Sequence, residues 1–498
     1  MNVFLMYPTK DFTVQDISPN ESALIQDLEL STLWNAMATG DQFVWKISRQ
    51  VTLSPLVDLD VILYRQDILN DCVNHESVVR DIYSIAASAI EREKKNYLGL
   101  FSSYPSAILQ RSVDVMQMFV ETLEQLKHIA QTHAHQFVSR GFCRFFTMLI
   151  NELGEEYLDQ VKSHLRELKF HKGVWISAAL GPGNKATRYR LHRTSQNKKS
   201  PWIARIMTKT PRFYTYTIAD RDDTGARALA ELRDRGINQV TSVLAQSTDH
   251  VLNFFTLLKT ELAFYMGCLT LHKVLAQKEE PLCFPVPAAA TERLLSVEGL
   301  YDVCLSLRQV PRVVGNTVKA DGKDMVIITG ANQGGKSTFL RSIGLAQLMM
   351  QCGMFVPAES FHANICDGLF THFKREEDVT MSSGKLDEEL HRMSEIVDHL
   401  KANSLVLFNE SFAATNEREG SEIARQIVSA LVEKHVQVFF VTHLYELASG
   451  LYHQRRENIL FLQPQRLSDG ERTFKLNEGK PLQTSYGEDL YHRIFGTD

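Results

Sequence analysis

Two stretches of the chain carry apolar residues at alternating three- and four-residue steps. The first runs from about residue 106 to 170 and the second from about 224 to 276. Such spacing gives each helix one apolar stripe and predicts long, packed helices. The pattern leaves two arrangements open, namely a long antiparallel pair of arms or ordinary members of a helical bundle. The first hundred residues favour shorter helices with turn breaks, as at Ser18, Pro19 and Asn20.

The segment between these helices has a different pattern. Residues 172–180 and 186–192 favour strands, and a Gly-Pro-Gly-Asn sequence at 181–184 favours a turn between them. We therefore expect a small β-rich tip, at about 165–220, on a mostly helical region that covers residues 1–285.

The last two hundred or so residues alternate between strand and helix patterns. A buried-strand run at 325–329 begins this alternation, after a proline-rich linker at 281–287. Strands that alternate with helices are typical of a mostly parallel sheet with helices on its faces. We expect an α/β domain over residues 286–498.

Composition mainly excludes other classes of protein. Hydrophobic residues make up 44% and charged residues 23% of the 498-residue chain, which favours a globular protein of two or more domains. Because no apolar run reaches the roughly eighteen residues of a membrane span, and the first residues lack a basic n-region, we expect neither a membrane segment nor a signal peptide. The seven cysteines are scattered without a CxxC pair, which favours reduced thiols in the cytoplasm.

The strongest candidate chemistry is a phosphate-binding loop of the form GxxxxGK[ST], directly after the predicted strand 325–329. Its glycines let backbone N–H groups turn toward phosphate oxygens, and the following helix offers its N-terminus to the anion. Lys336 is expected at the β- and γ-phosphates and Ser337 at Mg²⁺. The predicted nucleotide contacts are Gly330, Ala331, Asn332, Gln333, Gly334, Gly335, Lys336, Ser337 and Thr338.

Two later strands end in polar residues that complete such a site. Apolar residues 405–408 precede Asn409 and Glu410, and apolar residues 438–441 precede Thr442 and His443. Ligands of parallel sheets bind at the carboxyl ends of the strands. We therefore expect Glu410 to orient or deprotonate the attacking water, Asn409 to belong to the Mg²⁺ shell and His443 to reach the γ-phosphate. These residues predict an ATPase that uses ATP and Mg²⁺.

These motifs, in this order, resemble the MutS family of DNA mismatch-repair ATPases, within the wider ABC-type ATPases. Residues 328–341 are similar to the family's nucleotide loop, 352–358 to its GxxVPA segment, 440–447 to its ATH…EL switch and 485–487 to its SYG helix start. The resemblance is specific over about residues 326–496 and looser upstream. It implies an ABC-type ATPase domain joined to core, lever and clamp regions, and a homodimer that pairs through its ATPase domains. It also implies a signature loop, at Ser383 and Gly384, that reaches the partner's site.

Several features depart from the family pattern. Asn409 replaces an aspartate, Leu386 replaces the signature-loop serine that reaches the partner's γ-phosphate, and Val313 stands where an aromatic residue stacks on adenine. Losing one charge beside Mg²⁺ costs on the order of 1–4 kcal/mol, and this loss is consistent with slow hydrolysis. Adenine and guanine both stay open as the base. We expect a short MutS-related protein without the N-terminal mismatch-recognition domains.

Positive charge is concentrated between residues 162 and 212, although the whole chain has a formal net charge of −5. Glu167 is the one acid in this span, and Trp175, Tyr189 and Trp202 are interleaved with the basic residues. Such a patch favours binding to DNA phosphates without sequence reading, and a solvated loop or a docking site for an acidic protein is the alternative. The predicted DNA contacts are Lys172, Lys185, Arg188, Arg190, Arg193, Lys198 and Lys199.

We therefore expect a homodimeric DNA-binding ATPase of repair or recombination, in which ATP binding and hydrolysis alter the grip on duplex or branched DNA. Its expected location is the cytoplasm of a bacterial-type cell, at the nucleoid. The alternative is a nucleotide-gated protein-interaction module that hydrolyses little and does not bind DNA. Asn409 and Leu386 favour this alternative, whereas the basic tip favours DNA.

Overall fold

The structure is a computed structural model that describes residues 1–13, 20–95, 104–171, 173–192, 215, 217–219, 221–308, 312–330, 333–375, 384–466 and 472–481. The chain divides into two compact units. The first comprises Met1–Val3, Arg80–His135 and Arg144–Lys259, and the second comprises Phe4–Val79, Gln136–Cys143 and Thr260–Asp498. The unit with the phosphate-binding loop thus also contains residues from near the start of the chain. The domain boundary after residue 285 stays a prediction.

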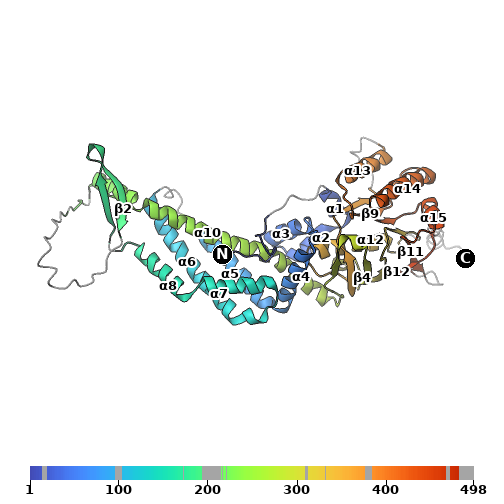
Figure 1. Ribbon diagram of the computed structural model, residues 1–498, viewed down its shortest axis with the longest axis horizontal. Helices are drawn as coiled ribbons and strands as arrows, with labels where there is room; N and C mark the ends of the chain where they lie inside the picture. Colours follow the sequence, from blue (N-terminus) through green and yellow to red (C-terminus); the bar gives the residue numbers. More distant parts are fainter. Residues whose placement is uncertain are drawn as a thin grey trace. The chain divides into compact units, whose positions relative to one another are not determined.

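The first unit is built mainly of helices (Figure 1). They are most of α5 (Glu76–Lys95), then α6 (Pro105–His133), α8 (Glu155–Glu167), most of α7 (Arg140–Glu152) and the first part of α10 (Asp223–Gln277). The predicted helical stretch 106–170 is therefore divided among three α-helices and the short η2 (Ala134–Gln136), whereas one helix covers the stretch 224–276.

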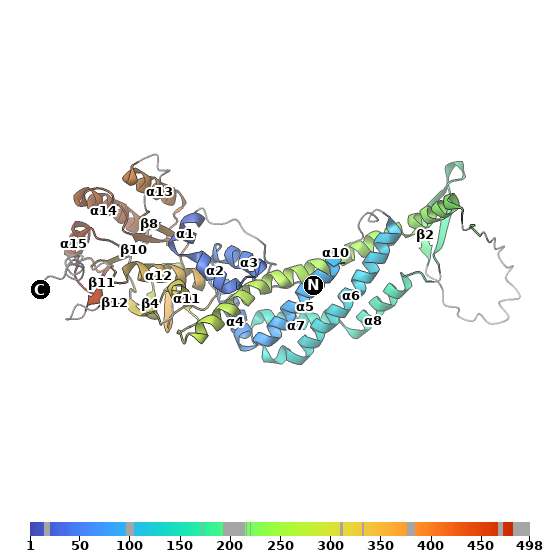
Figure 2. The same cartoon turned by 180° about the vertical axis from the view of Figure 1, so that it is seen from behind.

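Helices α6 and α10 lie side by side and run in the same direction (Figure 2). Near one end, the Thr241 hydroxyl donates to the Pro105 carbonyl oxygen at 3.3 Å. Further along, the rings of Phe119 and Phe255 pack with their centroids 5.3 Å apart. Sequence number rises in the same sense along both helices, so an antiparallel pair is wrong and the bundle is correct. Phe119 is buried and lies in the stretch 106–170, for which the sequence predicts an apolar stripe.

The tip of the first unit is a β-hairpin. Strand β1 (Trp175–Leu180) pairs antiparallel with β2 (Ala186–His192), and the short η3 (Pro182–Asn184) joins them. Strand β2 coincides with the predicted strand 186–192, whereas β1 begins three residues later than the predicted strand 172–180. Residues alternate in exposure along β2, which places Arg188 and Arg190 on its more exposed face.

The second unit contains two sheets. The six-stranded sheet has the order β12-β11-β6-β10-β9-β8, and all neighbours are parallel except β11 and β12. The four-stranded sheet has the order β3-β7-β4-β5. The strands are β3 (Val286–Ala288), β4 (Leu295–Leu300), β5 (Asn316–Lys319), β6 (Met325–Ile328), β7 (Ser360–Asn364), β8 (Leu369–Phe373), β9 (Leu405–Asn409), β10 (Gln437–Val441), β11 (Ile459–Arg466) and β12 (Arg472–Glu478). The mostly parallel sheet agrees with the predicted α/β class.

The central strands β6 and β10 are mostly apolar and are buried on both faces. Such strands are typical of a parallel sheet that helices cover on both sides. Besides the end of α10 and the first residues of α5 and α7, this unit contains the helices α1 (Glu21–Asp27), α2 (Leu30–Ala38), α3 (Gln42–Thr52), α4 (Leu59–Asn74), α11 (Val303–Arg308), α12 (Lys336–Gln351), α13 (Lys385–His399), α14 (Glu417–Glu433) and α15 (Tyr445–His453), with the short η4 (Ala290–Glu292). Side-chain caps begin several of them, such as Asn416 at α14, whose amide oxygen accepts from the Glu419 N–H.

A buried carboxylate ties the start of the chain to α10. Glu261 accepts backbone N–H groups from Leu5 at 2.6 Å, Met6 at 3.1 Å and Phe12 at 2.8 Å. The Tyr265 hydroxyl, one helical turn further on, donates to the Leu5 carbonyl oxygen at 2.5 Å. Burial raises the pKa of Glu261 to about 7, although the three N–H donors oppose the shift. Leu5, Met6 and Phe12 therefore pack in the core of the second unit, whereas Thr9 and Lys10 between them are exposed.

Among the described residues, α10 is long and apolar enough to pass a length-and-composition test for a membrane span. However, 72% of its apolar window is buried inside the protein, as expected of a core helix.

Candidate functional site

Parallel pairing brings the three predicted motifs to one edge of the sheet. Strand β10 lies between β6 and β9, and its last residue, Val441, pairs with both Ile328 and Asn409. Each of these strands therefore ends at the same level. The phosphate-binding loop follows β6, Glu410 follows β9 and His443 lies two residues beyond β10. This is the edge where parallel sheets bind ligands.

The described part of the loop turns sharply into α12. Gly330 has a φ of 105° and Gly335, which precedes α12, has a φ of 88°, a backbone region that glycine enters without a Cβ clash. Gln333 also has a positive φ, of 57°, and accepts a 2.7 Å hydrogen bond from Arg472 on β12. The predicted contacts Ala331 and Asn332 lie outside the described residues, whereas Gly334 and Thr338 lie within them.

Lys336 is a buried cation at the start of α12. Its Nζ donates to the Gly330 carbonyl oxygen at 2.7 Å, across the loop. Burial lowers the pKa of Lys336 to about 8, the Glu410 carboxylate raises it and the Arg472 charge lowers it. The ammonium group is thus held inside the loop, and a bound polyphosphate would favour its charged form.

Ser337 and Asn409 are in direct contact. The Ser337 hydroxyl donates to Asn409 Oδ1 at 2.8 Å, although the two residues are 72 positions apart. Both supply neutral oxygen atoms, which are ligands that Mg²⁺ accepts when waters and phosphates complete its shell. The residues therefore fit the predicted Mg²⁺ site. No group of three or more His, Cys, Asp or Glu side chains with metal-binding geometry occurs in the described part of the chain.

Glu410 and His443 form the second pair of the site. His443 Nε2 lies 2.8 Å from Glu410 Oε1, and both side chains are about 30% exposed. The hydrogen bond from His443 lowers the pKa of Glu410, with help from the His443, Lys374 and Lys336 charges, while burial opposes the shift. An ionised carboxylate that faces solvent at a strand end can accept a proton from water or orient it.

A cavity of about 340 Å³ lies beside the phosphate-binding loop. Val313, on its wall, is the position that the family resemblance assigns to base stacking. Phe474 of β12 also lines the cavity and is 46% exposed. Asn316 of β5 holds the Phe474 segment, because its amide donates to the Phe474 carbonyl oxygen at 3.3 Å and accepts from the Leu476 N–H at 2.7 Å. Sequence reasoning did not find Phe474, since no motif marks β12.

The candidate signature loop is described only at its end. Gly384 is the N-cap of α13, while Ser383 lies outside the described residues. Leu386 is half-buried in the first turn of α13. Its side chain has no hydrogen-bond donor or acceptor, so Leu386 cannot replace the hydrogen bond of the serine in the family pattern.

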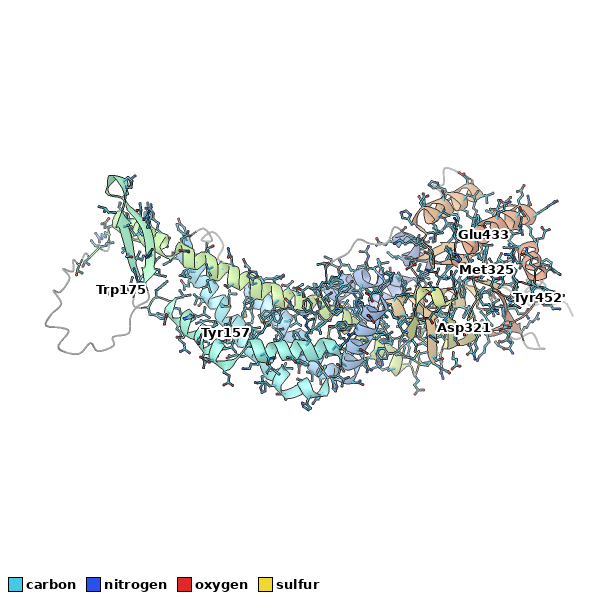
Figure 3. The ribbon with its side chains drawn as sticks, in the orientation of Figure 1. Tyr157, Trp175, Asp321, Met325, Glu433 and Tyr452 are labelled. Carbon is cyan, nitrogen blue, oxygen red and sulfur yellow. The ribbon has the colours of Figure 1, made fainter. Side chains whose placement is uncertain are left out.

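The basic tip is partly described. Lys185, Arg188 and Arg190 are exposed on the hairpin, and Trp175 is 61% exposed on β1 (Figure 3). By contrast, Lys162 pairs with Glu124 and Lys169 lies 3.5 Å from Asp114, so these two charges are partly neutralised within the helices. The other predicted DNA contacts, Lys172, Arg193, Lys198 and Lys199, lie outside the described residues.

Comparison with known proteins places both parts of the chain in one family. The MutS2 N-terminal domain matches residues 57–278, and MutS domain V matches residues 326–488. The DNA mismatch repair protein MutS of Streptococcus pneumoniae (strain Hungary19A-6) is 24% identical over 530 aligned residues, which cover 97% of this chain and 62% of that protein. The DNA mismatch repair protein HexA of Streptococcus pneumoniae serotype 4 (strain ATCC BAA-334 / TIGR4) has the same identity and coverage.

A human relative matches a shorter region. MutS protein homolog 4 of Homo sapiens is 30% identical over 206 residues, which cover 40% of this chain and 22% of that protein. The chain spans about 62% of the length of the bacterial relatives that it matches. Taken together with the two domain matches, these similarities show that the chain belongs to the MutS family.

Proposed function

We propose that this protein is an ATPase of MutS type that binds DNA and couples ATP binding and hydrolysis to its grip on duplex or branched DNA, in repair or recombination. The observation that carries the proposal is the convergence of Lys336, the Ser337–Asn409 contact and the Glu410–His443 pair at one edge of the sheet. This set matches the parts that phosphoryl transfer to water requires, namely a phosphate cradle, a metal position and a group that orients water.

Each side chain has a distinct role in this proposal. Lys336 would neutralise charge on the β- and γ-phosphates. Ser337 and Asn409 would hold Mg²⁺, which would draw electrons from the phosphate oxygens. Glu410 orients the attacking water and accepts its proton, and His443 fixes the Glu410 carboxylate while reaching toward the γ-phosphate. The base would occupy the cavity that Val313 and Phe474 line.

Membership of the MutS family supports two proposed partners, a second copy of the chain and DNA. Two copies would pair through their ATPase domains, and Gly384 with Ser383 would reach the partner's nucleotide. The exposed Arg188 and Arg190 would contact DNA phosphates without reading sequence. This activity suits a cytoplasmic, nucleoid-associated protein. The second candidate, a nucleotide-gated protein-interaction module, is favoured by Asn409 and by Leu386.

Nucleotide binding and turnover test the proposal. The wild-type protein should bind a fluorescent ATP analogue, and the Lys336→Ala variant should not. An undiminished affinity of this variant for the analogue would refute the assignment of the loop. ATP turnover is then measured alone and with mismatched, branched and single-stranded DNA. Stimulation by one DNA form supports the DNA-coupled ATPase. Nucleotide binding with neither DNA affinity nor turnover supports the interaction module instead.

A further inference from the structure

The residues directly after β9 form a strained turn. Glu410 has a φ of 56° and Phe412 a φ of 62°, and neither is a glycine. Residues other than glycine rarely adopt this left-handed backbone conformation, and they keep it only where the surrounding structure holds the backbone in place. Since Glu410 is the proposed water-orienting group, whatever holds this turn also sets the direction of its carboxylate.

One tether comes from β8. The Ser411 hydroxyl lies 2.7 Å from His372 Nδ1 and 2.5 Å from the His372 carbonyl oxygen, and both residues are fully buried. The His372 ring stacks on Phe412, with ring centroids 5.2 Å apart and planes 18° apart. Burial lowers the pKa of His372 to about 4, so the ring is neutral near pH 7. The middle residue of the turn is therefore attached to the sheet.

A second tether comes from α13. Glu389 is 1% exposed, and its Oε2 accepts the Phe412 backbone N–H at 2.9 Å. The Glu389 backbone also meets the first tether, because its carbonyl oxygen accepts from His372 Nε2 at 2.9 Å. Its Oε1 is buried and has no hydrogen-bond partner among the described residues. One residue of α13 thus holds the turn through both its side chain and its backbone.

We propose that Glu389 is a positioning residue for Glu410. Through Glu389, a displacement of α13 would shift the backbone that carries the water-orienting carboxylate. The inference rests on the proposed ATPase function and adds the route by which the site is regulated. Helix α13 begins at Lys385, next to Gly384, the described end of the candidate signature loop. A contact that moves the start of this helix would therefore move the hydrogen-bond acceptor of Phe412, and with it the backbone on which Glu410 stands.

The test compares Glu389→Ala with Glu389→Gln in the full-length protein. The amide oxygen of Gln can still accept the Phe412 N–H, whereas Ala leaves this buried N–H without its partner. We expect Glu389→Ala to lower kcat for ATP at least tenfold, with the affinity for a non-hydrolysable ATP analogue within about twofold of wild type. Glu389→Gln should restore kcat to within about threefold. Hydrogen–deuterium exchange at Phe412 should accelerate in the Ala variant and stay slow in the Gln variant.

Glu395→Ala is the matched control, because Glu395 lies on the same helix with an exposed side chain. It should match wild type in every measurement. An unchanged kcat in Glu389→Ala, or an equal loss in the Ala and Gln variants, would overturn the inference while leaving the ATPase proposal in place. A wild-type protein without turnover would overturn the proposed hydrolysis, and this inference with it. Analogue affinity within twofold shows that the variants fold.

Discussion

Ser337 donates a 2.8 Å hydrogen bond to Asn409, so the serine of the phosphate-binding loop is joined directly to the residue that ends β9. An aspartate at position 409 would bring a full negative charge to the same place. Asn409 instead presents a neutral amide oxygen. The contact therefore keeps the geometry of a metal site while lowering its charge, and this difference can be measured.

Asn409→Asp should strengthen Mg²⁺ binding and accelerate hydrolysis. One added charge at about 4 Å from a cation contributes about 1 kcal/mol even at the dielectric constant of water, or roughly fivefold in affinity. We expect the Mg²⁺ concentration for half-maximal turnover to fall at least that much. Asn416→Asp, which changes the exposed N-cap of α14 to another good cap, is the control. It should change neither the Mg²⁺ concentration for half-maximal turnover nor the rate of hydrolysis. A higher Mg²⁺ requirement in Asn409→Asp would contradict the metal assignment.

Nucleotide affinity should weaken at alkaline pH because Lys336 loses its proton. Its folded pKa of about 8 lies below the ordinary 10.5, so in the nucleotide-free protein the Lys336 side chain is cationic at pH 7 and mostly neutral at pH 9. If polyphosphate binds the charged form, the apparent Kd for ATP should rise roughly tenfold between pH 7 and 9. Titration by fluorescence at constant ionic strength measures it. Lys336→Arg keeps its charge over this range, and a similar pH dependence in that variant would exclude Lys336 as the cause.

Phe474→Ala should weaken ATP binding without weakening polyphosphate binding. Stacking of a base on an aromatic ring contributes about 1–3 kcal/mol, so we expect a loss of roughly 5- to 150-fold in ATP affinity. Inorganic tripolyphosphate, which has no base, should compete equally well in both proteins. Phe474→Tyr keeps the ring and should bind ATP like wild type. A parallel loss of tripolyphosphate binding would mean that Phe474 supports the loop rather than the base.

Charge reversal on the hairpin should weaken DNA binding in a salt-dependent way. We expect Arg188→Glu with Arg190→Glu to reduce duplex affinity at least tenfold at low salt. The slope of log affinity against log salt should also fall by about 0.9 for each DNA phosphate that the variant no longer neutralises. Lys162→Glu with Lys169→Glu is the matched control, with a smaller effect, because both lysines already face acidic partners. Equal effects of the two double variants would favour a general charge effect over direct binding by the hairpin.

Glu261 should make the second unit less stable as pH rises toward neutrality. Its folded pKa of about 7 exceeds the ordinary 4.5, so its contribution to stability is complete below about pH 4.5 and is lost as pH rises through 7. Urea unfolding at pH 5 and 7.5 measures the change. Glu261→Gln cannot titrate and should flatten this part of the profile. An unchanged profile in Glu261→Gln would place the pH dependence in other groups.

Local sequence was sufficient for the elements and for the order of the site's motifs. The loop at 330–338, the strands before Asn409 and Thr442, and the hairpin at the tip follow from apolar periodicity and turn residues, which act over a few positions. Parallel strands also place their carboxyl ends at one edge, so the meeting of Lys336, Glu410 and His443 could be predicted without knowing a single distance.

Tertiary structure alone decided how distant segments meet. The parallel course of α6 and α10 depends on the number of times the chain crosses the bundle, which an apolar stripe does not record. Phe474 reaches the cavity beside the phosphate-binding loop because Asn316 holds its strand, and Glu389 reaches Phe412 because α13 packs beside β8. These pairs join residues far apart in the chain. Packing selects them, whereas local propensity carries no information about such pairs.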